Sequence, residues 1–263
     1  MSQMLLPHER VTAAIRNAEK ASGVALLPFI TAGYPERERF IPTLRALAGT
    51  GDVIEVGVPF SDPMADGVTI QRASRAAIAS GVSLRWILGE LRQAGELAAP
   101  VVLMSYLNPL LAYGQDQLAA AARAAHVGGF IVPDLPLEES GELAARLDAQ
   151  GVGLIHLVTP ATPEARMRQL CEASRGFVYA VTVAGTTGGS ARAMSAGVTA
   201  YLDRVRALSP LPVCAGFGVR TPEQVRALSG HADGVIVGSA LVEELEARRD
   251  PVAFLDSLRS RRH

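Results

Sequence analysis

Short apolar runs alternate with amphipathic helical patterns along nearly the whole chain, and this alternation leaves few possible folds. Eight runs are predicted to be strands, at residues 25–31, 53–58, 101–105, 129–132, 153–158, 177–183, 213–215 and 234–237. Helical patterns cover residues 11–22, 38–47, 70–79, 84–97, 115–125, 138–149, 165–172, 200–208, 222–228, 240–244 and 251–259. Alternation of this kind implies parallel strands. Eight units preceded by an extra N-terminal helix predict a (β/α)8 barrel.

The competing fold is an open, doubly wound sheet that binds a dinucleotide. That fold requires a G-x-G-x-x-G turn opening a helix after the first strand, and the sequence has none there. No shift in composition marks a second domain, so we expect residues 1–263 to form a single barrel domain.

Charge and hydropathy exclude several classes of protein. The formal net charge is −1 and there is no basic block, which argues against nucleic acid as the main partner. The apolar runs are too short to span a membrane, and the first residues lack the apolar core of a signal peptide. We therefore expect a cytoplasmic protein. The two cysteines, Cys171 and Cys214, are expected to be buried thiols.

The sequence also limits the catalytic chemistry. Its single lysine, Lys20, precedes the first strand, whereas a Schiff-base lysine of a barrel enzyme lies on a strand or a top loop. Covalent amine catalysis is therefore not expected. No pair of histidines has zinc-site spacing, and no metal site is expected. His156 lies inside an apolar run, where a core histidine and a catalytic base are both possible.

One carboxylate interrupts the second strand. Side chains alternate along a strand, so Glu55 shares a face with Val53 and Gly57, while the other β-branched residues point to the opposite face. Gly57 is expected to leave open space beside the carboxylate. A buried charge is costly unless it is paired or used, and a second acid, Asp66, follows on the next loop. The pair predicts acid–base chemistry, with a structural glutamate beside a capping aspartate as the alternative.

Barrel enzymes take their reactive groups from the carboxyl ends of the strands and the loops that follow. This rule places on one face Glu55, Asp66, Tyr106, Asp134, Tyr179 and two late glycine turns. The turns, Gly216-Phe-Gly218 and Gly238-Ser239, follow the last two strands, where barrels commonly bind phosphate. The loop at residues 184–196 has the composition of a lid that closes over substrate, with an ordinary surface loop as the alternative.

Several motifs together suggest a family. They are Phe29-Ile-Thr-Ala-Gly-Tyr-Pro35, Glu55-Val-Gly-Val-Pro-Phe-Ser-Asp-Pro-Met-Ala-Asp-Gly67 with Thr69-Ile-Gln71, Pro133-Asp-Leu-Pro136 with Glu138-Glu-Ser140, Gly185-Thr-Thr-Gly188 and Gly216-Phe-Gly218. Over nearly the whole chain they resemble the family of tryptophan synthase α subunits. The resemblance implies a lyase of tryptophan biosynthesis, which cleaves indole-3-glycerol phosphate to indole and glyceraldehyde 3-phosphate without a metal or a covalent intermediate.

The resemblance also implies roles for individual residues. Glu55 would be the general acid and base, and Asp66 would stabilise positive charge at the indole nitrogen. The remaining substrate-binding residues would be Phe29 and Tyr106 beside the indole, Tyr179 near Glu55, Thr187 against Asp66, and Gly188, Gly216, Gly218, Gly238 and Ser239 around the phosphate.

By the same resemblance, Asp62 and Pro63 would face a β subunit in an α2β2 heterotetramer. The β subunit would carry pyridoxal phosphate, and this chain would need no cofactor. The sequence departs from the family pattern at Thr186 and Val183, which concerns closure of the loop rather than the chemistry. Two alternatives remain, a free-standing lyase and a catalytically poor allosteric subunit, and the intact acid pair argues against the second.

Overall fold

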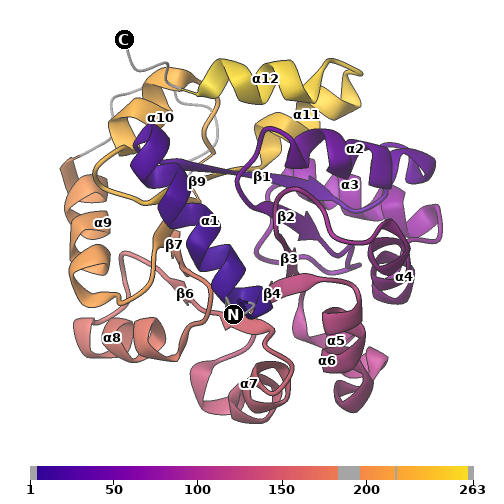
Figure 1. The fold of residues 1–263 in the computed structure, drawn as a ribbon, viewed down its shortest axis with the longest axis horizontal. Coiled ribbons are helices and arrows are strands. Elements are labelled where there is room, and N and C mark those ends of the chain that lie inside the picture. Colours follow the sequence, from indigo (N-terminus) through magenta and orange to yellow (C-terminus); the bar gives the residue numbers. More distant parts are fainter. Residues whose placement is uncertain (1–4, 183–195, 217, 260–263) are drawn as a thin grey trace.

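A computed structural model of the protein describes residues 5–182, 196–216 and 218–259, and it confirms the predicted barrel. The described strands form one parallel sheet in the order β5-β4-β3-β2-β1-β9-β8-β7-β6. The two ends of this order, β5 and β6, are consecutive in the chain and are separated by one residue, His156. The sheet therefore curls into a nearly closed barrel with helices around it (Figure 1).

The strands follow the predicted alternation with helices. They are β1 (Ala25–Thr31), β2 (Ile54–Gly57), β3 (Val101–Met104), β4 (Val127–Ile131), β5 (Gly153–Ile155), β6 (Leu157–Val158), β7 (Val178–Val181), β8 (Val213–Gly216) and β9 (Gly234–Val237). The α-helices are α1 (Pro7–Ser22), α2 (Phe40–Ala48), α3 (Val68–Ala79), α4 (Leu84–Ala94), α5 (Leu107–Tyr113), α6 (Gln115–Ala124), α7 (Gly141–Asp148), α8 (Glu164–Ala173), α9 (Ala196–Leu208), α10 (Pro222–Leu228), α11 (Ser239–Glu246) and α12 (Pro251–Leu258). Short 3-10 turns, η1 (Arg37–Arg39) and η2 (Leu137–Glu139), precede α2 and α7.

The predicted fifth strand is divided at His156. The backbone N–H of His156 donates to Oγ of Ser174 at 3.0 Å, and its carbonyl accepts the N–H of Tyr179 at 3.0 Å. On either side of this residue, β5 pairs with β4 and β6 pairs with β7. The break is therefore the point at which the barrel passes from one half of the sheet to the other.

The sequence does not predict helix α5, because Pro109 is typical of a turn. In the structure Pro109 is the third residue of α5, where a backbone N–H has no partner within the helix. The N–H of Leu107 at the start of the helix donates to Oδ1 of Asp134 at 2.9 Å. Since this cap comes from the next βα loop, the local sequence contains no capping signal.

The buried side chains form two clusters that follow the alternation along each strand. Val53 belongs to the cluster inside the barrel, whereas Ile54 and Val56 belong to the cluster between the sheet and the helices. This confirms the prediction of which side chains of the second strand share a face, and it places Glu55 on the face inside the barrel.

Helix α1 crosses one end of the barrel (Figure 1). Its residues Val11, Ile15 and Ala18 have helical spacing and join the inner cluster, so this helix packs against the barrel interior. Burying a side chain such as Ile15 contributes roughly 1.5–3 kcal/mol. In the described part of the chain, no helix has the length and apolar character needed to cross a membrane.

Candidate active site

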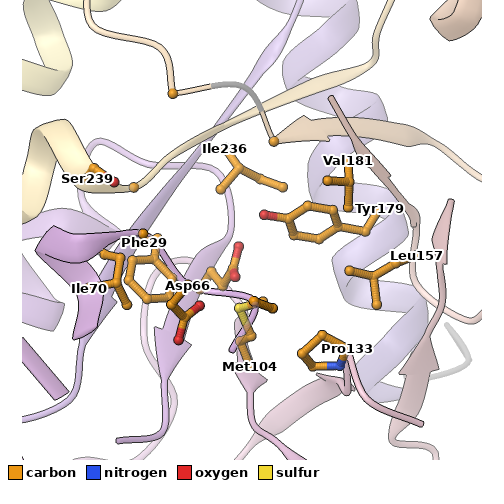
Figure 2. Close-up of a pocket in the computed structure, with 16 residues that line it drawn as sticks. Phe29, Asp66, Ile70, Met104, Pro133, Leu157, Tyr179, Val181, Ile236 and Ser239 are labelled. Carbon is orange, nitrogen blue, oxygen red and sulfur yellow. The ribbon is translucent and has the colours of Figure 1, made fainter. Parts of the chain in front are cut away.

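A cavity of about 230 Å³ lies where the βα loops gather (Figure 2). Eight of the predicted site residues line it, namely Phe29, Glu55, Asp66, Tyr179, Gly216, Gly218, Gly238 and Ser239. The rest of the wall is mainly apolar and includes Ile70, Met104, Pro133, Leu157, Val181 and Ile236. A pocket of this composition suits a ligand with a flat apolar part and a few polar ends.

Glu55 is the most deeply buried ionisable group in the described site. Its side chain is 0% exposed, and neither carboxylate oxygen has a hydrogen-bond partner among the described residues. Burial, together with the negative charge of Asp66, raises the pKa of Glu55 to about 8. Glu55 therefore holds a proton at neutral pH and can donate it to a ligand in the cavity.

The prediction that Gly57 leaves open space beside Glu55 is wrong. A Cβ atom added at Gly57 would lie 2.6 Å from Cζ of Phe29, so the aromatic ring already occupies that position. Phe29 is also the register partner of Glu55 in the β1–β2 pair. Gly57 thus makes room for the ring of Phe29, and the ring in turn keeps water away from the carboxyl group.

Asp66 lies on the loop between β2 and α3 and is half-buried. Burial raises its pKa to about 6, and a hydrogen bond from the hydroxyl of Tyr106 acts in the opposite direction. The two acids therefore have separated pKa values, with the proton on Glu55 and the negative charge on Asp66 near neutral pH. Such a separation assigns different chemical roles to two neighbouring carboxyl groups.

Tyr106 supports the acid loop and is not among the residues that line the cavity. Its hydroxyl accepts the backbone N–H of Ala65 at 2.8 Å, and its ring stacks on Phe60 with centroids 5.0 Å apart. Burial raises the pKa of Tyr106 to about 12, so the hydroxyl keeps its proton for Asp66. In this structure Tyr106 therefore fixes the backbone and carboxylate of the loop.

Tyr179 points its hydroxyl into the cavity (Figure 2). Burial and the charges of Glu55 and Asp66 hold its pKa well above the usual value, so the side chain is a neutral phenol. A Cβ atom at Gly216 would lie 2.7 Å from the Tyr179 hydroxyl oxygen. Only glycine at position 216 lets this ring reach its position.

Three glycines and a serine form the opposite rim of the cavity. Gly218 has a φ of +64°, a backbone conformation that glycine adopts readily. Helix α11 starts after Gly238 without a side-chain cap, which leaves N–H groups at its first turn available to an anion. Together with Gly216 and Ser239, these groups offer backbone donors to a phosphate. Among the described residues, no group of three or more His, Cys, Asp or Glu side chains could hold a metal ion.

The predicted partner residues lie on the same loop as Asp66, between β2 and α3, and do not line the cavity. Asp62 is exposed and its carboxylate accepts the hydroxyl of Ser61 at 2.5 Å, whereas Pro63 is buried. The exposed apolar surface of this region comes from Met64 and Val68, which are 91% and 76% exposed.

Some predictions fall outside the described residues, namely the roles of Thr187 and Gly188, the departures at Val183 and Thr186, and the lid at 184–196 apart from Ala196, which begins α9. Others are decided by the structure. His156 is buried, does not line the cavity, and has its pKa lowered to about 4 by burial and by Arg166. It is a neutral core histidine. Cys171 and Cys214 are buried thiols, as predicted.

The sequence analysis missed five apolar residues of the wall, Ile70, Met104, Leu157, Val181 and Ile236. A signal was available for four of them. Met104, Leu157, Val181 and Ile236 lie in the strands at even spacing from residues of the inner face, near the carboxyl ends. Asp134, predicted on the same face, caps α5 instead of lining the cavity.

Comparison with known proteins supports one family. A sequence model of the family described as tryptophan synthase alpha chain matches residues 15–259. A protein of that name from Nitratidesulfovibrio vulgaris is 46% identical over 248 residues, which cover 94% of this chain and 96% of the relative. Its counterpart from Solidesulfovibrio magneticus is 45% identical, with 97% and 98% covered.

Solved structures agree with the sequence relatives. Tryptophan synthase subunit alpha from Legionella pneumophila is 35% identical, with a TM-score of 0.85 and coverage of 95% of this chain and 97% of that chain. A tryptophan synthase structure from M. tuberculosis is 37% identical, with a TM-score of 0.84 and coverage of 95% and 96%. From the matched family model and from relatives well above 30% identity, the chain belongs to the tryptophan synthase alpha chain family.

Proposed function

We propose that this chain cleaves indole-3-glycerol phosphate to indole and glyceraldehyde 3-phosphate, as the α component of tryptophan synthase. The observation that carries this proposal is the pair of acids with separated pKa values at an apolar cavity. Backbone donors line the opposite rim of the same cavity, at the place where a substrate phosphate would be bound.

Glu55 would act first as the general acid. Indole is a poor leaving group until its C3 atom is protonated, and the buried, protonated Glu55 can supply that proton. Protonation places positive charge on the indole nitrogen, opposite the negative charge of Asp66. An ionised carboxylate at the place where positive charge develops lowers the energy of the transition state.

Glu55 would then act as the general base. The glycerol hydroxyl next to the bond that breaks gives its proton to the Glu55 carboxylate, and its oxygen becomes the aldehyde oxygen. The carbon–carbon bond breaks, and its electron pair returns to the protonated ring and releases neutral indole. Glu55 ends the cycle with a proton, as it began, and the reaction requires no oxidant or reductant.

The substrate would lie between the two rims of the cavity. Its indole would contact Phe29, Ile70 and Leu157, which supply apolar area without competing polar groups. Its phosphate would meet Gly218 and the first turn of α11. The chain would use no cofactor of its own, because the acid pair supplies the proton transfers and the charge stabilisation that a retro-aldol cleavage needs.

The proposed partner is a β subunit that carries pyridoxal phosphate and receives indole within an α2β2 assembly. A relative of known structure is described as tryptophan synthase, and the exposed apolar side chains of Met64 and Val68 beside the cavity mouth suit a protein contact. A cytoplasmic location follows from this role. We also propose that the barrel functions as one domain.

The direct test is to incubate the purified chain with indole-3-glycerol phosphate and measure indole, with and without a candidate β subunit. Indole release that the β subunit accelerates is the expected result. Release that does not change would favour a free-standing lyase. No release in either case would refute the catalytic proposal.

A further inference from the structure

The carboxylate of Glu243, on helix α11, connects two loops of the active site. Its Oε1 atom accepts a hydrogen bond from Oγ1 of Thr69 at 3.3 Å. The guanidinium of Arg220 holds the same carboxylate through both oxygens, at 2.7 Å to Oε2 and 2.9 Å to Oε1. Arg220 also lowers the pKa of Glu243, which therefore stays ionised. One carboxylate thus joins α3 to the turn that follows β8.

The two residues that bind Glu243 are close in sequence to residues at the two ends of the cavity. Thr69 is in the first turn of α3, three residues after Asp66, and Arg220 is two residues after Gly218. Ser239 and Glu243 are four residues apart on α11 and therefore share one face of the helix. The position of Glu243 consequently links the acid loop, the glycine turn and the start of α11.

A second contact strengthens the link one turn further along both helices. Arg72 of α3 bonds to Glu246 of α11 at 2.5 Å, and the hydroxyl of Tyr34 is hydrogen-bonded to both. Helices α3 and α11 therefore lie side by side with two polar connections between them. Thr69 lies in the first turn of α3 and Glu243 in the middle of α11, so their contact ties the start of α3, and the loop in front of it, to α11.

This arrangement matters because the cavity must hold one substrate at two ends. Misplacement by about 1 Å can cost a large factor in rate when the reacting groups must meet a bound substrate. The Arg220 and Glu243 side chains are 53% and 35% exposed, and a pair of this kind adds little to stability. The fold is therefore expected to survive its removal, which makes an effect on activity measurable.

We propose that Glu243 is a positioning residue, which sets the separation between Asp66 and the phosphate-binding rim. This inference rests on the proposed function for the identity of the substrate. The contacts themselves involve neither Glu55 nor the bond that breaks.

The test compares Glu243→Ala with the control Glu244→Ala. Glu244 is the neighbouring residue on α11, and Arg249 binds it at 2.6 and 2.9 Å within the same segment, away from the cavity. We expect Glu243→Ala to raise KM and lower kcat, so that kcat/KM falls by about 10- to 100-fold. Glu244→Ala should keep both parameters within about twofold of the wild type, as is usual for a surface ion pair.

Two further variants divide the effect between the two ends of the cavity. Thr69→Val removes the connection to the acid loop and should lower mainly kcat. Arg220→Ala removes the connection to the glycine turn and should raise mainly KM. Glu243→Gln keeps an acceptor for Thr69 and should recover part of the lost kcat. Circular dichroism and a thermal melt confirm that each variant is folded.

Binding of glycerol 3-phosphate, measured by calorimetry, separates this inference from the proposed function. If the wild type releases no indole, the proposed function fails, and the relative affinities of Glu243→Ala and Glu244→Ala still decide the positioning role. The positioning role would be overturned if Glu243→Ala and Glu244→Ala had equal kcat and KM, or equal affinities for glycerol 3-phosphate. The positioning role would also be overturned if Glu243→Ala bound glycerol 3-phosphate more tightly than the wild type and the double variant Glu243→Ala/Arg220→Ala did not. In that case the role of Glu243 would only be to hold the Arg220 guanidinium away from the phosphate.

Discussion

The environment of Glu55 decides what the carboxyl group can do. A buried carboxyl without hydrogen-bond partners among the described residues keeps its proton until about pH 8. The sequence predicted this because an acid in an otherwise β-branched strand must be paired or used. It did not predict that Phe29 fills the space at Gly57, because that contact joins two strands.

Glu55→Gln should lower indole formation by roughly 10²- to 10⁴-fold, because it removes the transferable proton and keeps the shape of the side chain. Affinity for a substrate analogue should change little. The measurements are steady-state indole release and calorimetric binding of the analogue. Near-normal turnover by this variant would refute the assignment of Glu55 as the acid.

The dependence of activity on pH should also report the acid pair. Cleavage needs a protonated Glu55 and an ionised Asp66, so activity should fall above about pH 8 and below about pH 6. The substrate phosphate also titrates near pH 6, so the alkaline limb is the cleaner test. The charge of Asp66 raises the pKa of Glu55, and Asp66→Asn should therefore move the alkaline limb of the residual activity to lower pH. An alkaline limb that stays at the same pH would show that the two acids do not interact.

At the scale of the elements, the sequence predicted what depends on local periodicity. The eight predicted barrel strands and the N-terminal helix are encoded in runs of three to twelve residues, so pattern alone finds them. Helix α5 depends on a cap from Asp134, which is 27 residues away from Leu107, and the break at His156 depends on Ser174. Contacts between segments that are distant in the sequence determine these two features, so no local sequence pattern predicts them.

Asp134→Ala should destabilise the protein by about 0.5–2 kcal/mol, the usual cost of removing a helix cap. It should also lower kcat, because α5 begins directly after Tyr106 and this tyrosine holds the acid loop. The matched control is Asp250→Ala, which removes the cap of α12. Both variants should lose similar stability in urea unfolding, but only Asp134→Ala should lose activity. If the two variants had equal activity, the position of α5 would have no influence on the active site.

Gly218→Ala should weaken binding of glycerol 3-phosphate, because a φ of +64° is unfavourable for alanine and the turn would shift away from the anion. Gly230→Ala is the matched control, since Gly230 has a φ of +90° and does not line the cavity. Calorimetric titration of both variants is the measurement. If both bind the ligand as tightly as the wild type, the phosphate lies elsewhere.

At the scale of the whole molecule, the barrel places the acid loop next to the surface where a partner would dock. Met64, 91% exposed, is two residues before Asp66, and Val68, 76% exposed, is two residues after it. Pro63 is buried, so it would shape this surface from within rather than contact a partner directly. A β subunit that covers Met64 and Val68 would therefore act on the backbone that carries Asp66.

This geometry predicts coupling between substrate binding and assembly. A glycerol-phosphate analogue should tighten binding of the β subunit, and by linkage the β subunit should tighten binding of the analogue by the same factor. Met64→Glu should weaken the complex at least about tenfold, because it places a charge in an apolar contact. Ile78→Glu introduces the same charge at a partly exposed position at the other end of α3 and should have no such effect. Calorimetric titration of a cognate β subunit, with and without the analogue, measures both quantities. If the analogue leaves the affinity of the wild type unchanged, the two sites are independent and the free-standing lyase becomes the better description of this chain.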